Sequence, residues 1–130
     1  MIILSIKTDN PIAEIALFDN DKLLDSISWE AHRQLADTIH RTIQTLLERN
    51  KLSWDRLQGI GIFKGPGSFT GLRIGMSVTN ALALSLGIPV VSVAGKDWQN
   101  ECIRRLLNHE NEKVVVPEYG GDVFTTKPKK

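Results

Sequence analysis

The chain has 130 residues, enough for one domain with a single hydrophobic core and too few for two substantial domains. Its content of 42% apolar and 24% charged residues excludes a disordered or fibrous class, and a formal net charge of +1 gives no basic footprint for wrapping nucleic acid. One cysteine excludes an internal disulfide, and no apolar run approaches the roughly 20 residues that a membrane helix requires.

Three strands are predicted near the start of the chain, at Ile2–Ile6, Ile12–Phe18 and Lys22–Trp29. Turn-forming residues separate the second strand from the third, so we expect these two to pair antiparallel. An amphipathic helix is predicted from about Arg33 to Asn50, because its apolar residues recur at intervals of three and four. These apolar residues are Leu35, Ile39, Ile43, Leu46 and Leu47.

Strands and helices alternate in the rest of the chain. The predicted elements are a strand at Gly59–Phe63, a helix at Thr70–Leu86, a strand at Pro89–Ala94 and a helix at Lys96–Leu107. The order β-β-β-α-β-α-β-α predicts an α/β fold with a mixed five-stranded sheet, antiparallel at first and joined by parallel crossovers afterwards. We expect residues 1–111 to form this domain. Residues 112–130 are predicted to form a partly flexible extension, of which only the first few residues can pair.

The segment "KGPGSFTGLRIG", from Lys64 to Gly75, joins a buried strand to the mouth of a helix. Unpaired backbone N–H groups and the helix dipole can bind an anion there, which makes this a candidate phosphate-binding loop. Its candidate residues are Lys64, Gly65, Gly67, Ser68, Thr70 and Gly71. The specific templates fail, because Walker A needs a lysine where Leu72 stands and the dinucleotide fingerprint needs a glycine at Thr70. The loop by itself is therefore a weak signal for phosphate.

The helix after the loop offers a different interpretation, because small residues recur along it at steps of four, at Gly71, Gly75, Thr79 and Ala83. It is apolar nearly all round, with Arg73 as its only charge, and its own sheet covers one side. The remaining surface is covered either by the first helix or by another polypeptide, and we favour the second. The predicted partner interface comprises Leu35, Ile39, Ile43, Gly71, Leu72, Gly75, Met76, Thr79 and Ala83.

Several segments resemble the TsaB (YeaZ) family, the bacterial subunit that assists synthesis of threonylcarbamoyladenosine in tRNA. They are "IILSIKTDN", "LSWDRLQGIGIFKGPGSFTG", "GPGSFTGLRIG" and "ALALSLGIPVVSVAG". The resemblance covers roughly residues 1–94 and implies a single actin-like ATPase (ribonuclease-H-like) subdomain. Members of the family usually carry two such subdomains, whereas this chain has room for one. It also has Lys7 where the family usually has an aspartate, with Asp9 two positions later.

The resemblance implies a noncatalytic accessory subunit, without catalytic or metal-binding residues of its own. It would pair with a TsaD-like catalytic subunit through the first two helices, and a TsaE-like ATPase would join the assembly. We expect no cofactor in this chain, ATP and magnesium only in the assembled complex, and contact with tRNA only indirectly. A homodimer is an alternative when the partner is absent. The absence of a leader-like start and of a membrane span predicts a cytoplasmic protein.

A second hypothesis is a nucleotide-binding homodimer or ATPase-like enzyme that uses the "GPGSFTG" loop. For the other residues that are candidates for catalysis or metal binding, we favour a structural role. His32 and His40 are eight residues apart, which excludes the zinc motif with two histidines four apart on one helix. Cys102 lies on an apolar helical stripe and is predicted to be a buried, inert thiol.

A ribonuclease H activity would need carboxylates that converge on two metal ions. The carboxylates near the first strands are Asp9, Glu14 and Asp25, and we expect Glu14 and Asp25 to point outward as exposed residues. The lysine-rich tail could contact tRNA or an acidic partner, and a solvated terminus is favoured.

Overall fold

The computed structural model describes residues 1–118, and these contain one mixed sheet with the strand order β3-β2-β1-β4-β5. The strands are β1 (Ile2–Lys7), β2 (Ile12–Asp19), β3 (Lys22–Glu30), β4 (Gly59–Phe63) and β5 (Val90–Val93). β1 and β2 pair antiparallel, as do β2 and β3, whereas β1 with β4 and β4 with β5 pair parallel. The predicted element order and the change from antiparallel to parallel pairing are confirmed.

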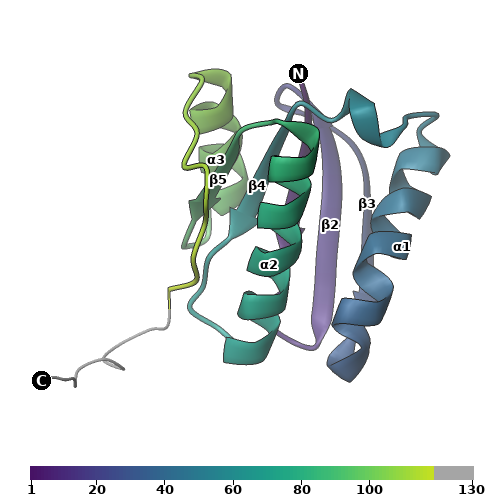
Figure 1. The fold of residues 1–130 in the computed structure, drawn as a ribbon, viewed down its shortest axis with the longest axis vertical. Helices are drawn as coiled ribbons and strands as arrows, with labels where there is room; N and C mark the ends of the chain where they lie inside the picture. Colours follow the sequence, from purple (N-terminus) through teal and green to yellow (C-terminus); the bar gives the residue numbers. More distant parts are fainter. Residues whose placement is uncertain (119–130) are drawn as a thin grey trace, which may run out of the picture.

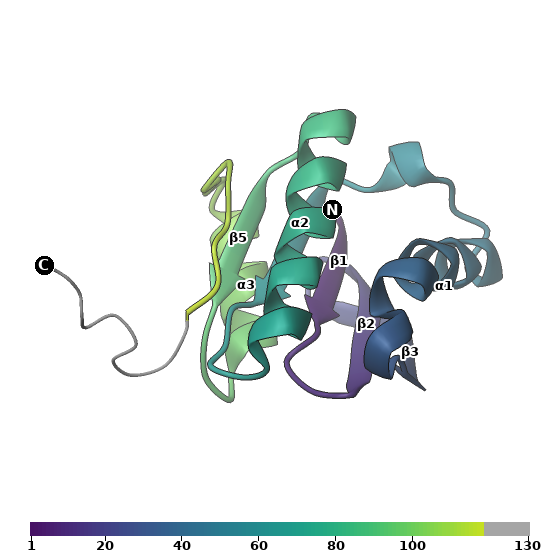
Figure 2. The same cartoon turned by 60° about the horizontal axis from the view of Figure 1, so that its bottom comes forward.

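Helices cover both faces of the sheet. Helices α1 (Leu35–Arg49) and α2 (Phe69–Leu86) lie on one face, and α3 (Trp98–Leu107) lies on the other (Figure 1, Figure 2). Gly87 ends α2 in the left-handed conformation at φ +67°, as the stop signal predicts. The first helix begins later than predicted, because residues 32–34 form a short 3-10 helix and His32 has a φ of +46°.

The core has two layers, one on each face of the sheet. Under α1 and α2 it consists mainly of leucine and isoleucine side chains, among them Ile39 and Ile43 of α1, which are fully buried. On the other face β4 has no side chain at Gly61, and a Cβ there would lie 2.6 Å from Cys102 Cβ, so α3 packs directly on this strand. Cys102 is buried, as predicted, and burial raises the pKa of its thiol to about 12.

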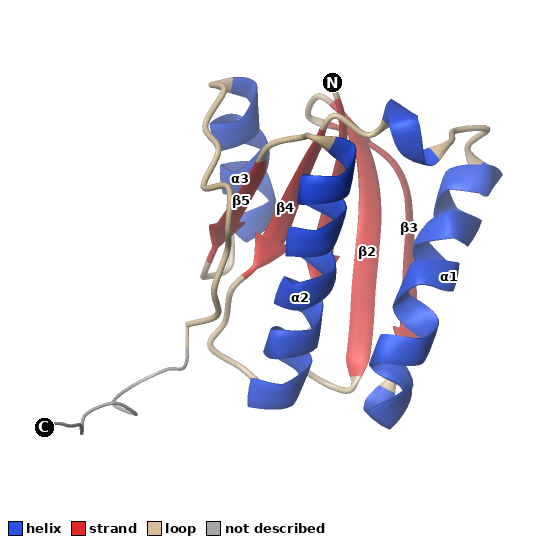
Figure 3. Cartoon of the chain, viewed as in Figure 1, coloured by secondary structure: helices blue, strands red, loops and turns tan. Residues whose placement is uncertain are grey.

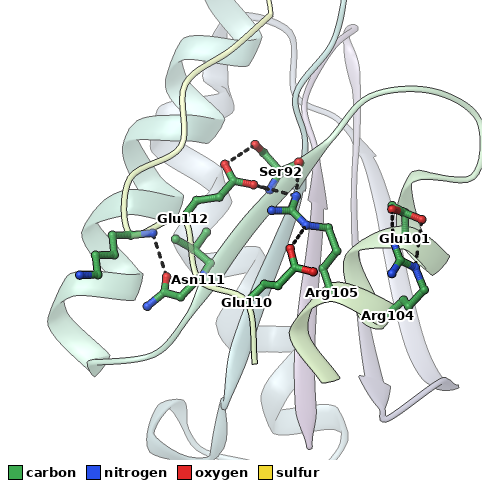
Figure 4. A network of polar contacts seen from close by, with 9 residues as sticks. Ser92, Glu101, Arg104, Arg105, Glu110, Asn111 and Glu112 are labelled. Carbon is green, nitrogen blue, oxygen red and sulfur yellow. Dashed lines mark hydrogen bonds and ion pairs between the residues drawn. The ribbon is translucent and has the colours of Figure 1, made fainter. Parts of the chain in front are cut away.

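The segment that follows α3 runs along the β5 edge of the sheet (Figure 3). Glu112 accepts hydrogen bonds from the backbone N–H and the hydroxyl of Ser92, both at 2.8 Å. The guanidinium of Arg105 donates to Glu112 at 2.8 Å and to Glu110 at 2.7 Å (Figure 4). Side chains therefore satisfy most of the backbone hydrogen-bonding groups of this edge, where we expected the segment to pair through its own backbone. The backbone bond from Glu112 N to the carbonyl of Val90 is the part that pairs in strand fashion.

The same segment continues onto α2. The side-chain amide of Asn80 exchanges two hydrogen bonds with the backbone of Val115, which is itself buried. Glu118 N donates to Lys64 O at 2.7 Å, so the described chain ends beside the glycine-rich loop. The contact predicted for the lysine-rich tail falls in residues 119–130, outside the described residues. Within residues 1–118, no helix has both the length and the hydropathy to cross a bilayer.

Candidate protein-interaction surface

The glycine-rich loop between β4 and α2 is fastened by its own chain. Ser68 is the N-cap of α2, where its hydroxyl accepts a bond from Gly71 N at 3.5 Å and its carbonyl accepts one from Leu72 N at 2.9 Å. Ser68 N donates to Asp9 O at 2.7 Å, which ties the loop to the turn between β1 and β2. Gly65 adopts a φ of +105°, a conformation that favours glycine.

The turn between β1 and β2 packs into the glycine positions of the loop and of α2. A Cβ at Gly67 would collide with Asp9, and Cβ atoms at Gly71 and Gly75 would collide with the carbonyl and the hydroxyl of Thr8. Thr8 is buried, and its hydroxyl donates to Gly71 O at 2.9 Å. Glycine is needed at these positions because backbone or side-chain atoms of Thr8 and Asp9 come too close for any side chain.

The small-residue ridge of α2 therefore faces inward, and its assignment to a partner interface is wrong. Gly71 and Gly75 contact the turn, and farther along the helix Thr79 and Ala83 are buried under the helix. Steps of four small residues do mark a close helix contact. The sequence pattern cannot tell whether the approaching backbone belongs to the same chain or to another, and here it belongs to the same chain.

The large residues predicted for the interface are also core residues. Their exposed fractions lie between 0% and 4%, which leaves no side-chain surface for a partner. They are Leu35, Ile39, Ile43, Leu72 and Met76. The amphipathic pattern of α1 marks the face that packs on β2 and β3, as it does in most helices of soluble proteins.

The candidate phosphate-binding loop has several of its polar groups engaged by its own chain. Lys64 N donates to Val93 O and its carbonyl accepts from Glu118, while the Ser68 hydroxyl and N–H are used as described above. Other backbone or side-chain atoms fill the space where a Cβ would stand on Gly65, Gly67 and Gly71, and Thr70 is exposed. These contacts give the phosphate hypothesis no support beyond the helix N-terminus itself.

Lys7 is the last residue of β1, and its ammonium group binds the nearby carboxylate of Asp9. Its Nζ lies 2.6 Å from Asp9 Oδ1 and 5.0 Å from the centre of the Phe63 ring. The other carboxylates considered in the sequence do not converge on Asp9. Glu14 lies on the α3 face of the sheet, whereas Asp25 is half-buried on the α1 face, where it binds Arg49. Within the described residues, no three metal-binding side chains form a cluster.

The surface that remains open on α2 is its outer face, which we define by its residues. They are Thr70, Arg73, Ile74, Ser77, Val78, Ala81 and Leu84. Between this face and α1 lies a groove of about 320 Å³ that Ile74, Val78 and Ala36 line with apolar atoms. Leu84 is 85% exposed, and Arg73 lies over the Phe69 ring at 5.2 Å. One residue of the sequence indicates this face. Arg73 is the only charged residue of the helix, and a charged side chain is expected on the solvent side.

Strand order, pairing directions and the division of helices between the two faces define a ribonuclease-H-like, actin-like fold. RuvC of T. thermophilus has the same fold, with a TM-score of 0.55 over 92% of this chain and 85% of its own, at 12% identity. YeaZ from Pseudomonas aeruginosa matches more closely in sequence, with 28% identity and a TM-score of 0.66, over 72% of this chain and 43% of its own.

Sequence comparison narrows this class to a family. The family described as TsaD, tRNA N6-adenosine threonylcarbamoyltransferase, matches residues 29–104. A relative from Buchnera aphidicola subsp. Acyrthosiphon pisum, named tRNA threonylcarbamoyladenosine biosynthesis protein TsaB, is 32% identical over 93 residues. The chain therefore belongs to the TsaB (YeaZ) family. The match covers 72% of this chain but 42% of the Buchnera protein, so the matched region spans less than half the length of that relative.

Proposed function

We propose that this chain is a noncatalytic accessory subunit in the synthesis of N6-threonylcarbamoyladenosine in tRNA. In this proposal it pairs with a TsaD-like catalytic subunit, and a TsaE-like ATPase joins the assembly. Contact with tRNA is indirect, and the chain acts in the cytoplasm. The relatives' names support the pathway, whereas the pairing and the division of labour are our inference.

The observation that carries the pairing is the outer face of α2. The helices α1 and α2 stand on one face of the sheet, so their outward sides form one surface with a shallow groove between them. The apolar residues Ile74, Val78 and Leu84 line or flank this surface, and one cation, Arg73, stands among them. A helix of a partner can bury such a strip in the manner of an amphipathic helix in a groove.

The proposal is tested by co-purification with the TsaD-like subunit of the same organism, followed by a tRNA modification assay with and without this chain. Leu84→Arg places a charge on the most exposed apolar residue of the face without disturbing the core. We expect it to weaken binding about tenfold or more.

The matched control is Leu107→Arg, which introduces the same charge at a partly exposed leucine of α3 on the other face. We expect it to bind like the unchanged chain. Equal binding by all three proteins would show that α2 is the wrong surface. Failure to co-purify, together with a tRNA modification rate that is the same with and without the chain, would overturn the accessory role itself.

The proposal includes the expectation that the chain needs no cofactor of its own. ATP with magnesium should give no heat of binding to the isolated chain in calorimetry. Micromolar binding that is lost in Ser68→Ala would instead favour a nucleotide-binding homodimer. The engaged polar groups of the loop are the reason for preferring the first outcome.

A further inference from the structure

β4 and β5 are neighbouring parallel strands, and the helices that follow them lie on opposite faces of the sheet. The loop after β4 leads to α2, and the loop after β5 leads to α3 (Figure 1, Figure 2). Because the two loops diverge, they leave a crevice at the carboxyl ends of the strands, and open α/β sheets bind ligands in such crevices. The carboxyl ends of β4 and β5 are therefore a favoured position for a ligand.

A cavity of about 390 Å³ lies at this position. Its volume is within the range of about 300–1,000 Å³ that is usual for small-molecule pockets. The walls come from the ends of β1 and β4, from the two diverging loops and from the first residue of α3. They are Lys7, Phe63, Pro66, Gly95, Lys96 and Trp98.

Two aromatic rings form the apolar part of the wall. The ring centroids of Phe63 and Trp98 lie 5.8 Å apart, and the rings meet edge to face at 63°. Each residue is 7% exposed, so the surrounding core holds both rings in place. A fixed aromatic wall of this kind favours a planar apolar group, which can lie against it without rearranging the protein.

Two ammonium groups line the same cavity, and they differ in their partners. The ammonium of Lys7 is bound by Asp9 at 2.6 Å. Lys96 is exposed, and its ammonium has no hydrogen-bond or ion-pair partner among residues 1–118. The carboxylate next to it in the sequence, that of Asp97, accepts a hydrogen bond from Asn100 at 2.8 Å. The cavity therefore has one positive charge, on Lys96, that is available to a ligand.

This charge selects the class of ligand. Lys96 would repel a cation, and a neutral molecule that covered the lysine would remove water from the ammonium without replacing its hydrogen bonds. A polyphosphate needs several charged donors, whereas this wall offers one free ammonium. A single carboxylate matches one ammonium in charge and in hydrogen bonding.

We propose that this cavity binds a small organic acid that has one carboxylate and a planar apolar body. The carboxylate pairs with Lys96 at the mouth, and the apolar body lies against Phe63 and Trp98. The inference does not depend on the proposed function, because none of the residues that line the cavity belongs to the outer face of α2.

NMR titration of the isotope-labelled full chain with benzoate, phenylacetate and naphthoate tests the proposal. We expect at least one of these acids to shift the backbone N–H signals of Gly95 and Lys96 and the indole N–H signal of Trp98. The indole signals of Trp29 and Trp54 are internal controls and should not move, because neither residue lines the cavity. The proposal is overturned if none of the three acids shifts the cavity signals, or if the shifts lie elsewhere.

The role of the charge is tested with a matched probe and a matched variant. The amide of the acid that binds best has nearly the same shape without the charge. We expect it to bind about fivefold more weakly, the effect of one partly exposed ion pair. Lys96→Gln should weaken binding of the acid by a similar factor. Lys22→Gln, at an exposed lysine beside the opposite end of β1, should leave it unchanged. Equal binding of acid and amide, or equal effects of the two lysine variants, would overturn the proposal.

Discussion

Helices α1 and α2 cover the same face of the sheet but attach to it in different ways. α1 buries large residues such as Ile39 and Ile43 and keeps charged and polar residues outside. It is also held by polar contacts, among them the bond from Trp29 Nε1 to Thr38 Oγ1 at 3.0 Å. In α1, residue size and polarity both identify the buried side.

In α2 the relation between residue size and burial is partly reversed. Its first turns approach the β1–β2 turn through Gly71 and Gly75, which have no side chain to bury. Large apolar residues remain on the outer face, where Leu84 is mostly exposed. The comparison of α1 with α2 shows that a helix that is apolar all round can pack its small residues against its own fold. Its larger apolar residues are then left for contacts elsewhere.

The largest expected effect is a difference in stability between substitutions on the inner and outer sides of α2, within one turn of the helix. Gly75→Leu puts a side chain where Thr8 already lies, and we expect it to reduce the free energy of unfolding by about 3 kcal/mol or more. Ser77→Leu, on the exposed outer face, should change it by less than about 0.5 kcal/mol. Urea unfolding followed by circular dichroism measures both. Similar values for the two variants would show that the ridge does not pack inward.

This outcome also revises an expectation drawn from the sequence. If Gly75 lay at a partner interface, a bulky replacement would abolish pairing and leave the monomer folded. Because Gly75 packs against Thr8 of its own chain, the replacement is expected to damage the fold first. Loss of pairing in that variant would therefore say nothing about the partner surface, which is why Leu84 is used above.

A smaller effect of opposite sign is expected at Thr79, farther along the inner side of α2. Its side chain is fully buried, and Oγ1 has no hydrogen-bond partner among the described residues. Thr79→Val keeps the shape and removes the unpaired hydroxyl, so we expect a gain of about 1 kcal/mol in the free energy of unfolding. Thr79→Ser, which keeps the hydroxyl and loses a methyl group, should lower it. A loss of stability in the valine variant would mean that the hydroxyl is bonded.

The fold was predictable because its signals are local. The spacing of Leu35, Ile39 and Ile43 identifies α1, and Gly87 identifies the end of α2, without knowledge of any distant residue. The start of α1 was displaced because the positive φ at His32 arises where Ala31 N bonds to Pro11 O, a contact between distant segments.

The candidate surface was predictable only in part. Naming α2 as a helix with an unusual surface needed only its composition. Choosing its outward side required knowing that Thr8, more than sixty positions away, fills the space beside Gly71 and Gly75. Arg73 was the local clue to the solvent side, and the small-residue pattern outweighed it. The side-chain bonds of Glu112 to Ser92 had no sequence signal, because they join an irregular segment to a strand edge.

The smallest predicted effect concerns the polar attachment of α1 and depends on pH. Arg49 donates to Asp25 at 2.6 Å and 3.1 Å, and Asn50 donates at 2.9 Å. The hydrogen bond from Arg49, and next that from Asn50, lowers the pKa of the Asp25 carboxyl below its ordinary value of 3.8. Because the folded pKa is the lower one, this carboxylate stabilises the fold above about pH 3.8. That contribution is lost as the pH falls through the folded pKa.

Asp25→Asn should therefore lower the free energy of unfolding by up to about 1 kcal/mol at neutral pH, a modest amount because the pair is partly exposed to solvent. The difference between the variant and the unchanged chain should shrink as the solution is acidified below the ordinary carboxyl range. Arg49→Gln serves as the control, since it removes the same ion pair from the other side and should show the same pH dependence. If the difference in the free energy of unfolding persisted in acid, Asp25 would hold α1 by packing and not by its charge. Both helices would then be attached by packing, and α1 and α2 would differ only in the size of the packed residues.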